Sequence, residues 1–146
     1  MKATFWLLLG CSLAMVSCSG KRPAQLGLRD GRLTPCPASP NCVSSQSEDA
    51  RHAIDPLRYG DARQEARVRL LGVLRSMPGA TIVTEEGDYI HAEFRSRLFR
   101  FVDDVEFFFD EQEGIIQTRS ASRLGHSDLG VNRKRMEKVR VRFEKP

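Results

Sequence analysis

Residues 119–133 hold the densest group of side chains that could do chemistry. The sequence RSASRLGHSDLGVNR combines arginines, serines, a histidine and an aspartate with two glycines. Upstream, FVDDVEF at 101–107 places three acids inside an apolar run. Together the two segments supply these candidate site residues: Asp103, Asp104, Arg119, Ser120, Ser122, Arg123, His126, Asp128, Asn132 and Arg133.

A serine hydrolase is one chemistry that these residue types allow. Ser120 or Ser122 could act as the nucleophile. His126 as the base and Asp104 as its orienting acid would complete a triad. However, the sequence lacks the Gly-x-Ser-x-Gly elbow that exposes such a serine on a sharp turn. A hydrolase is therefore the alternative hypothesis, and we expect no catalytic residue here.

An anion site is the second chemistry that the segment allows. Arginine side chains and the free backbone amides at a helix start can hold an anion together. Arg119, Arg123 and Arg133 lie around Gly130, where the last helix is expected to begin. The sequence therefore predicts an anion or ligand pocket here, or else a purely structural polar cluster.

The structural alternative centres on Asp103, which alternates in phase with apolar residues of its own strand. A carboxylate on a core-facing side is costly unless it is paired and hydrogen-bonded. An arginine at 119, 123 or 133 is the expected partner and would tie the last helix to the sheet. Asp128 lies close enough to that helix to cap it, with Asn132 as a second candidate near its start.

A metal site is not expected, although Asp103, Asp104 and Glu106 are close in sequence. Adjacent residues of a strand point to opposite faces, so the first two cannot easily serve one ion. His52 and His91 stand alone in the sequence and are expected at the surface. Because no zinc, phosphate-loop or dinucleotide motif occurs, we expect no cofactor.

The elements that must position these residues follow from hydrophobic spacing. A helix is predicted over 61–77, capped by Asp61 and stopped by Pro78-Gly79. Four strands, joined by turns short enough for antiparallel pairing, are predicted over 80–85, 88–95, 102–109 and 115–121. A final helix is predicted over 130–143, where alternation near its end also allows a strand. The fold class is α+β, a four-stranded antiparallel sheet (about 80–121) flanked by two helices (about 61–77 and 130–143).

The first twenty residues, MKATFWLLLGCSLAMVSCSG, have the build of an export signal. Lys2 precedes an uncharged stretch over 3–16, which is shorter than the ~20 residues of a membrane-spanning helix. The sequence MVS before Cys18 resembles the lipobox of bacterial lipoproteins, which implies a signal peptide over 1–17 and a lipid on Cys18. Cys11 is a rival lipidation site, and an uncleaved anchor or plain secretion are further alternatives. Ser19 resembles the sorting signal for the outer membrane.

Residues 18–35 are rich in Gly, Arg, Lys and Pro, which predicts a flexible tether to a single domain over 36–146. Cys36 and Cys42 remain after the leader cysteines, and an even pair in an oxidising compartment predicts a disulfide. A redox-active pair and free thiols stay as alternatives, whereas a metal site would need two more ligands. Residues 36–60, rich in proline, are expected to form an irregular covering segment.

Charge is unevenly placed along the chain. The 146 residues carry 23 Lys and Arg against 19 Asp and Glu, an excess too small to indicate nucleic acid. Residues 80–118 have a net charge of −7, however, and residues 119–146 a net charge of +6. These segments could pair with each other, or the basic end could face anionic phospholipid headgroups.

Three separated blocks of sequence then indicate a family. LTPCPASPNCVSSQ, YIHAEFRSRLFRFVDDVEFFFD and RSASRLGHSDLGVNRKRMEKVR resemble signature segments of the bacterial domain-of-unknown-function 1499 family (DUF1499), in the same order. The resemblance covers roughly residues 32–145. It implies no catalytic residue, because the family has no established activity, and it implies that the VDD and RSASR…SDLGVNR segments belong together. Members of this family are often membrane-attached or exported.

The sequence thus predicts a lipid-anchored protein of the bacterial cell envelope, on the periplasmic side and in the outer membrane. The leading functional hypothesis is a non-enzymatic accessory or anion-binding module at the membrane face. Its expected partners are the membrane, an anionic lipid or another envelope protein, and not nucleic acid. The alternative is an envelope hydrolase that uses the cluster at 103–133.

Overall fold

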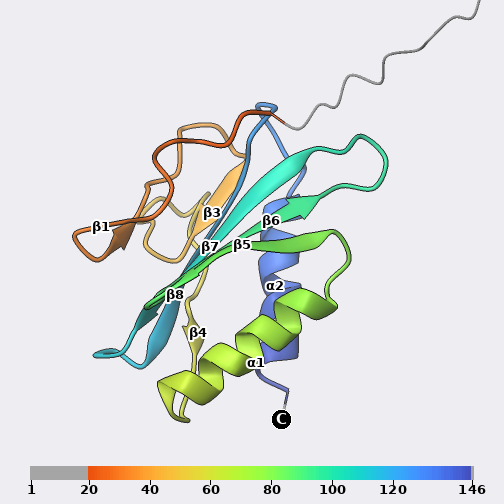
Figure 1. The fold of residues 1–146 in the computed structure, drawn as a ribbon. Helices are drawn as coiled ribbons and strands as arrows, with labels where there is room; N and C mark the ends of the chain where they lie inside the picture. Colours follow the sequence, from red (N-terminus) through yellow and green to blue (C-terminus); the bar gives the residue numbers. More distant parts are fainter. Residues whose placement is uncertain (1–19, 146) are drawn as a thin grey trace, which may run out of the picture.

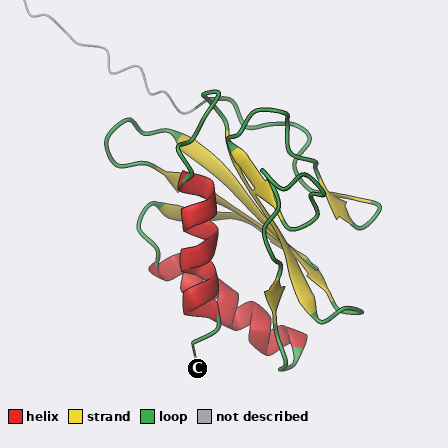
Figure 2. Ribbon diagram, turned by 180° about the vertical axis from the view of Figure 1, so that it is seen from behind, coloured by secondary structure: helices red, strands yellow, loops and turns green. Residues whose placement is uncertain are grey.

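Six strands form one antiparallel sheet, and two helices pack on one of its faces (Figures 1 and 2). The computed structural model describes residues 20–145. The sheet order is β3-β8-β7-β6-β5, and β4 pairs with the same β8 strand as β3. The elements are β1 (Leu28–Arg29), β2 (Arg32–Leu33), β3 (Cys42–Ser44), β4 (Leu57–Arg58), α1 (Arg63–Ser76), β5 (Ala80–Glu86), β6 (Tyr89–Arg95), β7 (Val102–Asp110), β8 (Ile115–Ser122) and α2 (Val131–Phe143).

The two helices and the four long strands confirm the α+β prediction. Helix α1 buries one apolar stripe, which includes Ala66, Leu70 and Leu74. It ends at Ser76, one residue before the prediction, because Met77 is extended ahead of Pro78. Gly79 at φ 79° then turns the chain so tightly against β6 that a Cβ there would lie 2.5 Å from the Arg95 carbonyl oxygen. The predicted cap is wrong: Ala62 is the N-cap, and the Asp61 carboxylate instead pairs with Arg69.

The hydrophobic core lies between the helices and the adjacent face of the sheet. Alternate residues of β6 and β7 point into it, and α2 contributes residues at helical spacing. The strand alternative for the end of α2 is wrong, because Met136, Val139 and Phe143 are all buried from one helical face. The largest buried side chains are Phe107, Phe109, Phe143, Leu57, Leu70, Leu74, Ile90, Ile116 and Met136.

The sheet has six strands in place of the four predicted. The two additional strands, β3 and β4, come from the segment 36–60 that was expected to be irregular. They pair with β8 over three and two residues respectively. Strands this short show no alternation that a sequence pattern could reveal.

Residues 20–35 are ordered against the domain in place of the predicted flexible tether. They contain the β1–β2 hairpin, and Leu33 is 3% exposed. The backbone N–H of Leu33 donates to the Gln46 side chain. The predicted leader, with Cys11, Cys18 and Ser19, lies outside the described residues. Within residues 20–145, neither helix has the length and apolar character needed to cross a bilayer.

Candidate functional site

The sheet face that points away from the helices carries a buried layer of charged and polar side chains. We call it the charged layer and define it as Tyr89, His91, Glu93, Asp104, Glu106, Arg119 and Arg123. Antiparallel register sets Glu93 opposite Asp104 and Glu106 opposite Arg119 on neighbouring strands. Asp104 is 1% exposed and Glu106 is 0% exposed. Burial of so many charges on a sheet face requires a cover and mutual pairing.

The N-terminal segment supplies that cover. The Gly27 N–H donates to Glu106 Oε1 at 2.8 Å, and Arg22 Nε donates to Glu93 Oε1 at 2.9 Å. Figure 1 shows this segment, drawn in orange and red, crossing the sheet on the side away from α1 and α2. The charged layer is therefore enclosed between the sheet and the segment that precedes it in sequence.

Arg123 is the centre of one half of the layer. Its guanidinium donates to both Asp104 carboxylate oxygens, at 2.8 and 2.7 Å, and to Glu93 at 2.5 Å. His91 Nε2 donates to the same Asp104 carboxylate at 2.8 Å. Burial opposes ionisation of Asp104, but the hydrogen bonds from Arg123 and His91 together outweigh it and lower its pKa. The balance is the same at Glu93, where burial opposes ionisation and Arg123 and Arg22 lower the pKa.

Glu106 is the centre of the other half. Arg119 Nη1 donates to its Oε2 at 2.9 Å, and the Tyr89 hydroxyl donates to its Oε1 at 2.8 Å. Burial, followed by the neighbouring Glu106 charge, raises the pKa of Tyr89 far above its usual value. Tyr89 is therefore a fixed hydrogen-bond donor at physiological pH.

A second polar cluster lies on the helix-facing side of the sheet, around Asn132. This side chain is 0% exposed. Its amide nitrogen donates to the Asn41 carbonyl and to Ser122 Oγ, and its oxygen accepts from the Ser120 hydroxyl at 2.6 Å. The N-cap residue of α2 is Gly130, and Asp128, two residues before it, accepts from the Asn132 backbone N–H at 2.8 Å and so satisfies a free amide of the first turn, as expected.

Asp103 belongs to this second cluster, and its partner is not one of the three arginines that the sequence suggested. Arg135, from the second turn of α2, pairs with its carboxylate and lies 4.9 Å over the Phe94 ring. The predicted tie between the last helix and the sheet thus exists, through a different residue. Strand register explains the difference, since Arg119 and Arg123 leave the opposite face of the sheet.

Eight of the ten candidate residues accordingly divide between two sites on opposite faces, and Arg133 and His126 belong to neither. Asp104, Arg119 and Arg123 belong to the charged layer, while Asp103, Ser120, Ser122, Asp128 and Asn132 surround α2. Arg133 donates to the Ala53 and Arg51 carbonyl oxygens. The three arginines therefore do not converge on Gly130, and Asp128 already occupies the amides at the helix start.

The triad residues are also apart. His126 is exposed, and among the described residues no hydrogen bond joins it to a serine or a carboxylate. The histidine that does pair with a buried acid is His91, which was expected at the surface. The part of the chain between residues 20 and 145 also contains no group of three metal-ligating side chains.

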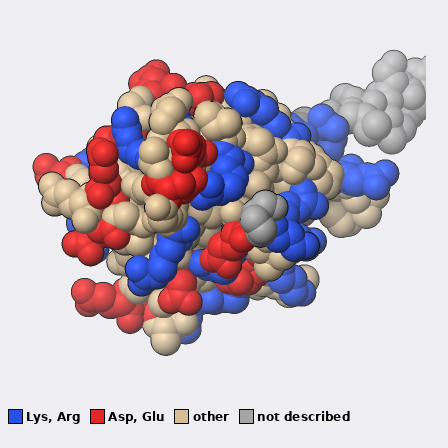
Figure 3. Space-filling model, turned by 90° about the horizontal axis from the view of Figure 1, so that it is seen from below, with Lys and Arg blue, Asp and Glu red and all other residues tan. Residues whose placement is uncertain are grey.

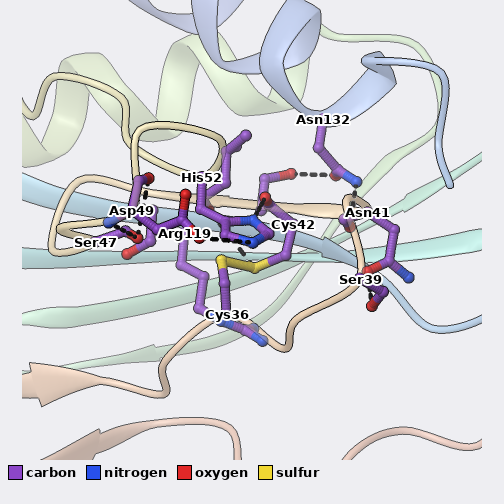
Figure 4. Close-up of a disulfide and its surroundings, with 12 residues drawn as sticks. Cys36, Ser39, Asn41, Cys42, Ser47, Asp49, His52, Arg119 and Asn132 are labelled. Carbon is purple, nitrogen blue, oxygen red and sulfur yellow. Dashed lines mark hydrogen bonds and ion pairs between the residues drawn. A yellow bond between two sulfur atoms is a disulfide. The ribbon is translucent and has the colours of Figure 1, made fainter. Parts of the chain in front are cut away.

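The predicted disulfide is present between Cys36 and Cys42 (Figure 4). It anchors the segment 36–60 at β3, where Cys42 pairs with Ala121 of β8. His52 lies beside the disulfide and is 4% exposed, with Nδ1 2.8 Å from the Cys42 carbonyl oxygen. Both histidines expected at the surface are thus buried.

The comparison with family models gives one match, to "Protein of unknown function (DUF1499)", over residues 32–143. The chain belongs to this family. Neither the curated proteins nor the solved structures contain a match. The family match includes both polar clusters and the disulfide, while Arg22 and Gly27 of the cover lie before it.

The DUF1499 domain also has an exposed apolar end, which sequence reasoning missed. We call it the loop end and define it as residues 96–101, between β6 and β7, together with 124–131, the loop after β8 and the first residue of α2. The two loops line one shared cavity of about 350 Å³. Their large apolar residues are strongly exposed: Leu98 80%, Phe99 64%, Phe101 44%, Leu124 46%, Leu129 86% and Val131 47%.

Charge in the DUF1499 domain is also divided between the two ends of the sheet. The β5–β6 and β7–β8 turns and the strand ends beside them, at the opposite end of the sheet, carry acids: Glu85, Glu86, Asp88, Asp110, Glu111 and Glu113. Bases lie in or beside the loop end: Arg95, Arg97, Arg100, Arg133 and Lys134. In Figure 3, acidic side chains are more frequent toward the left and basic ones toward the right, which is the side of the β6–β7 loop in Figure 1.

Between this end and the helices the domain has a groove of about 550 Å³. Its floor contains Met77, Pro78 and Phe94, and its rim is formed by bases of β6, the β6–β7 loop and α2. The spacing of Lys134, Lys138 and Arg142 on one helical face was the sequence signal that could have indicated it.

Proposed function

We propose that this DUF1499 protein is a lipid-anchored component of the bacterial cell envelope, held on the periplasmic side of the outer membrane through Cys18. Its domain acts there as a non-enzymatic accessory or ligand-binding module. The observation that carries the proposal is the position of Gly20, the first described residue. A Cβ placed on Gly20 would lie 3.0 Å from Arg123 Cβ and 3.1 Å from Leu124 Cγ, at the loop end.

The chain therefore enters the domain at its exposed apolar end. If Cys18 carries a lipid, only one residue separates it from Gly20, so the loop end must lie close to the bilayer. Exposed Phe and Leu side chains with flanking bases are the composition that favours an anionic membrane interface. Each base near such a surface contributes about 1 kcal/mol of attraction.

The hydrolase alternative has no comparable support. Ser120 and Ser122 bond to Asn132 rather than to a histidine, so neither serine has a base to remove its proton. The geometry favours a binding or accessory role for the domain over covalent catalysis.

The test compares two cysteine variants of the full chain in a bacterial host. Cys18→Ser should remove the acyl mass from the N-terminus and release the protein from the membrane fraction. Cys11→Ser, at the rival lipidation site, should change neither the acyl mass nor the membrane association. Intact mass spectrometry of the fractionated protein gives both readings. Unprocessed wild-type chain in the cytosol, with Cys36 and Cys42 reduced, would refute the proposal.

A further inference from the structure

We propose that the groove beside the loop end binds a single-chain anionic amphiphile, a molecule with one alkyl chain and a carboxylate or phosphate head. The inference specifies the ligand class of the binding module proposed above. It rests on the proposed membrane location only for the source of the ligand. The groove lies between the end of α1, the end of β6 and the outward face of α2.

The floor of the groove fits an alkyl chain. Met77, Pro78 and Phe94 form it, with Val131 at the end nearer the loops. The volume of about 550 Å³ is within the range of small-ligand sites, and the lining is mainly apolar. Since Met77 and Phe94 are only 8% and 5% exposed, the floor is a firm part of the core surface rather than a mobile loop.

The rim of the groove fits an anionic head. Arg95, Arg97, Lys134 and Lys138 line it, and among the described residues no carboxylate pairs with any of them. This contrasts with Arg135, which pairs with Asp103, the single acid of the lining. Four unpaired cations above an apolar floor are complementary to one anion attached to an apolar chain.

Helix α2 presents two of these cations, Lys134 and Lys138, in a row. Val131, Lys134 and Lys138 follow helical spacing along one face, while Met136 and Val139 face the core. An alkyl chain lying from Val131 toward Met77 would bring its head within reach of the two lysine ammonium groups. Lysine suits this role because its flexible stem can follow a head of either type.

The position of the groove explains how such a ligand could arrive. Ser96 and Val131 line both the groove and the neighbouring cavity between the two loops, so the groove opens into the exposed apolar end. A molecule leaving a bilayer beside Phe99 and Leu129 could enter without passing its chain through water. This continuity favours an amphiphile over an acidic peptide, which has no need of an apolar route.

The test is photo-cross-linking of the purified full chain in a neutral maltoside detergent. Three diazirine probes share one alkyl chain: a fatty acid, a lysophosphatidylglycerol and an uncharged monoacylglycerol. At least one of the two anionic probes should label peptides that contain Met77, Phe94 or Val131, about tenfold more strongly than the uncharged probe, as expected for a charge-assisted head contact. The stronger of the two anionic probes identifies the source as free acid or phospholipid.

Paired variants on α2 make the result specific. Val131→Trp fills the groove and should abolish labelling, while Val141→Trp, at a similarly exposed position outside it, should not. Lys134→Gln with Lys138→Gln should lower anionic labelling about tenfold, whereas Lys145→Gln should leave it unchanged. Circular dichroism establishes that each variant is folded.

Equal labelling by the charged and uncharged probes would overturn the proposal. So would labelling that persists in Val131→Trp. The Cys18→Ser chain separates this inference from the anchoring: groove labelling in a released chain supports the ligand site on its own. A membrane-anchored chain whose groove no anionic probe labels would refute the ligand site alone.

Discussion

Replacement of Arg123 by methionine should strongly destabilise the domain, because this one guanidinium neutralises two acids in the charged layer. The Arg123 side chain is 6% exposed, and its partners Asp104 and Glu93 are 2% and 15% exposed. Methionine keeps much of the apolar stem and removes the charge. Asp104 then keeps only the hydrogen bond to His91, while burial continues to oppose its ionisation.

The expected loss follows from the burial of the pair. Leaving a buried carboxylate without its cation costs about 3–5 kcal/mol, a large fraction of the 5–15 kcal/mol that stabilises a typical domain. Replacing Arg123 and Asp104 together by apolar groups costs far less, since Glu93 keeps Arg22 as its partner and no buried carboxylate is left without a cation. The double variant Arg123→Met with Asp104→Leu should therefore be more stable than Arg123→Met alone.

Urea unfolding followed by circular dichroism measures these differences in the free energy of unfolding. The matched control is Arg51→Met, which removes an arginine whose partner Asp49 is an exposed acid, with side chains 68% and 40% exposed. This control should change stability little. An Arg123→Met variant no less stable than Arg51→Met, or a double variant no better than the single, would contradict the assignment of a buried ion pair.

Two further predictions concern pH and the cluster on the other face. The pKa values of Asp104 and Glu93 are lowered in the folded state, so the stabilisation from these two carboxylates is complete above their usual pKa values of 3.8 and 4.5 and is lost as the pH falls below those values. Urea unfolding should therefore show constant stability from neutral pH to about pH 5 and a decline at pH 3. Equal stability at pH 3 and pH 7 would contradict this prediction. Asn132→Ala should cost about 1–3 kcal/mol because it leaves the Ser120 hydroxyl and the Asn41 carbonyl without this partner, as measured by thermal unfolding beside the exposed control Lys134→Ala.

Long periodic segments were predictable from the sequence because burial imposes their pattern. The helical stripe of α1 and the alternation in β6, β7 and β8 each reflect one face turned toward the core. The observed bounds differ from the predicted ones by at most two residues. The disulfide was predictable from the parity of the remaining cysteines.

Other features depend on contacts between distant segments, which a local pattern does not contain. Residues 20–35 have the composition of a linker, and they are held in place by Glu93 and Glu106 about seventy to eighty residues later. His91 is polar by type and is buried because Asp104 and the cover enclose it. The pairing of Asp103 with Arg135 required the register of β7 against α2, which sequence spacing alone does not fix.

The charged layer and the loop end are linked through the N-terminal segment. A flexible tether would leave the domain free to rotate at the membrane, whereas Arg22 and Gly27 hold this segment on Glu93 and Glu106. The same contacts keep Gly20 against Leu124 and so fix which end of the domain lies nearest the start of the described chain. Arg123 belongs to both the charged layer and the contact with Gly20, since its guanidinium pairs with Glu93 and its Cβ borders Gly20. A buried ion-pair network that stabilises the sheet would, in a lipid-anchored chain, also orient the basic apolar end toward the bilayer.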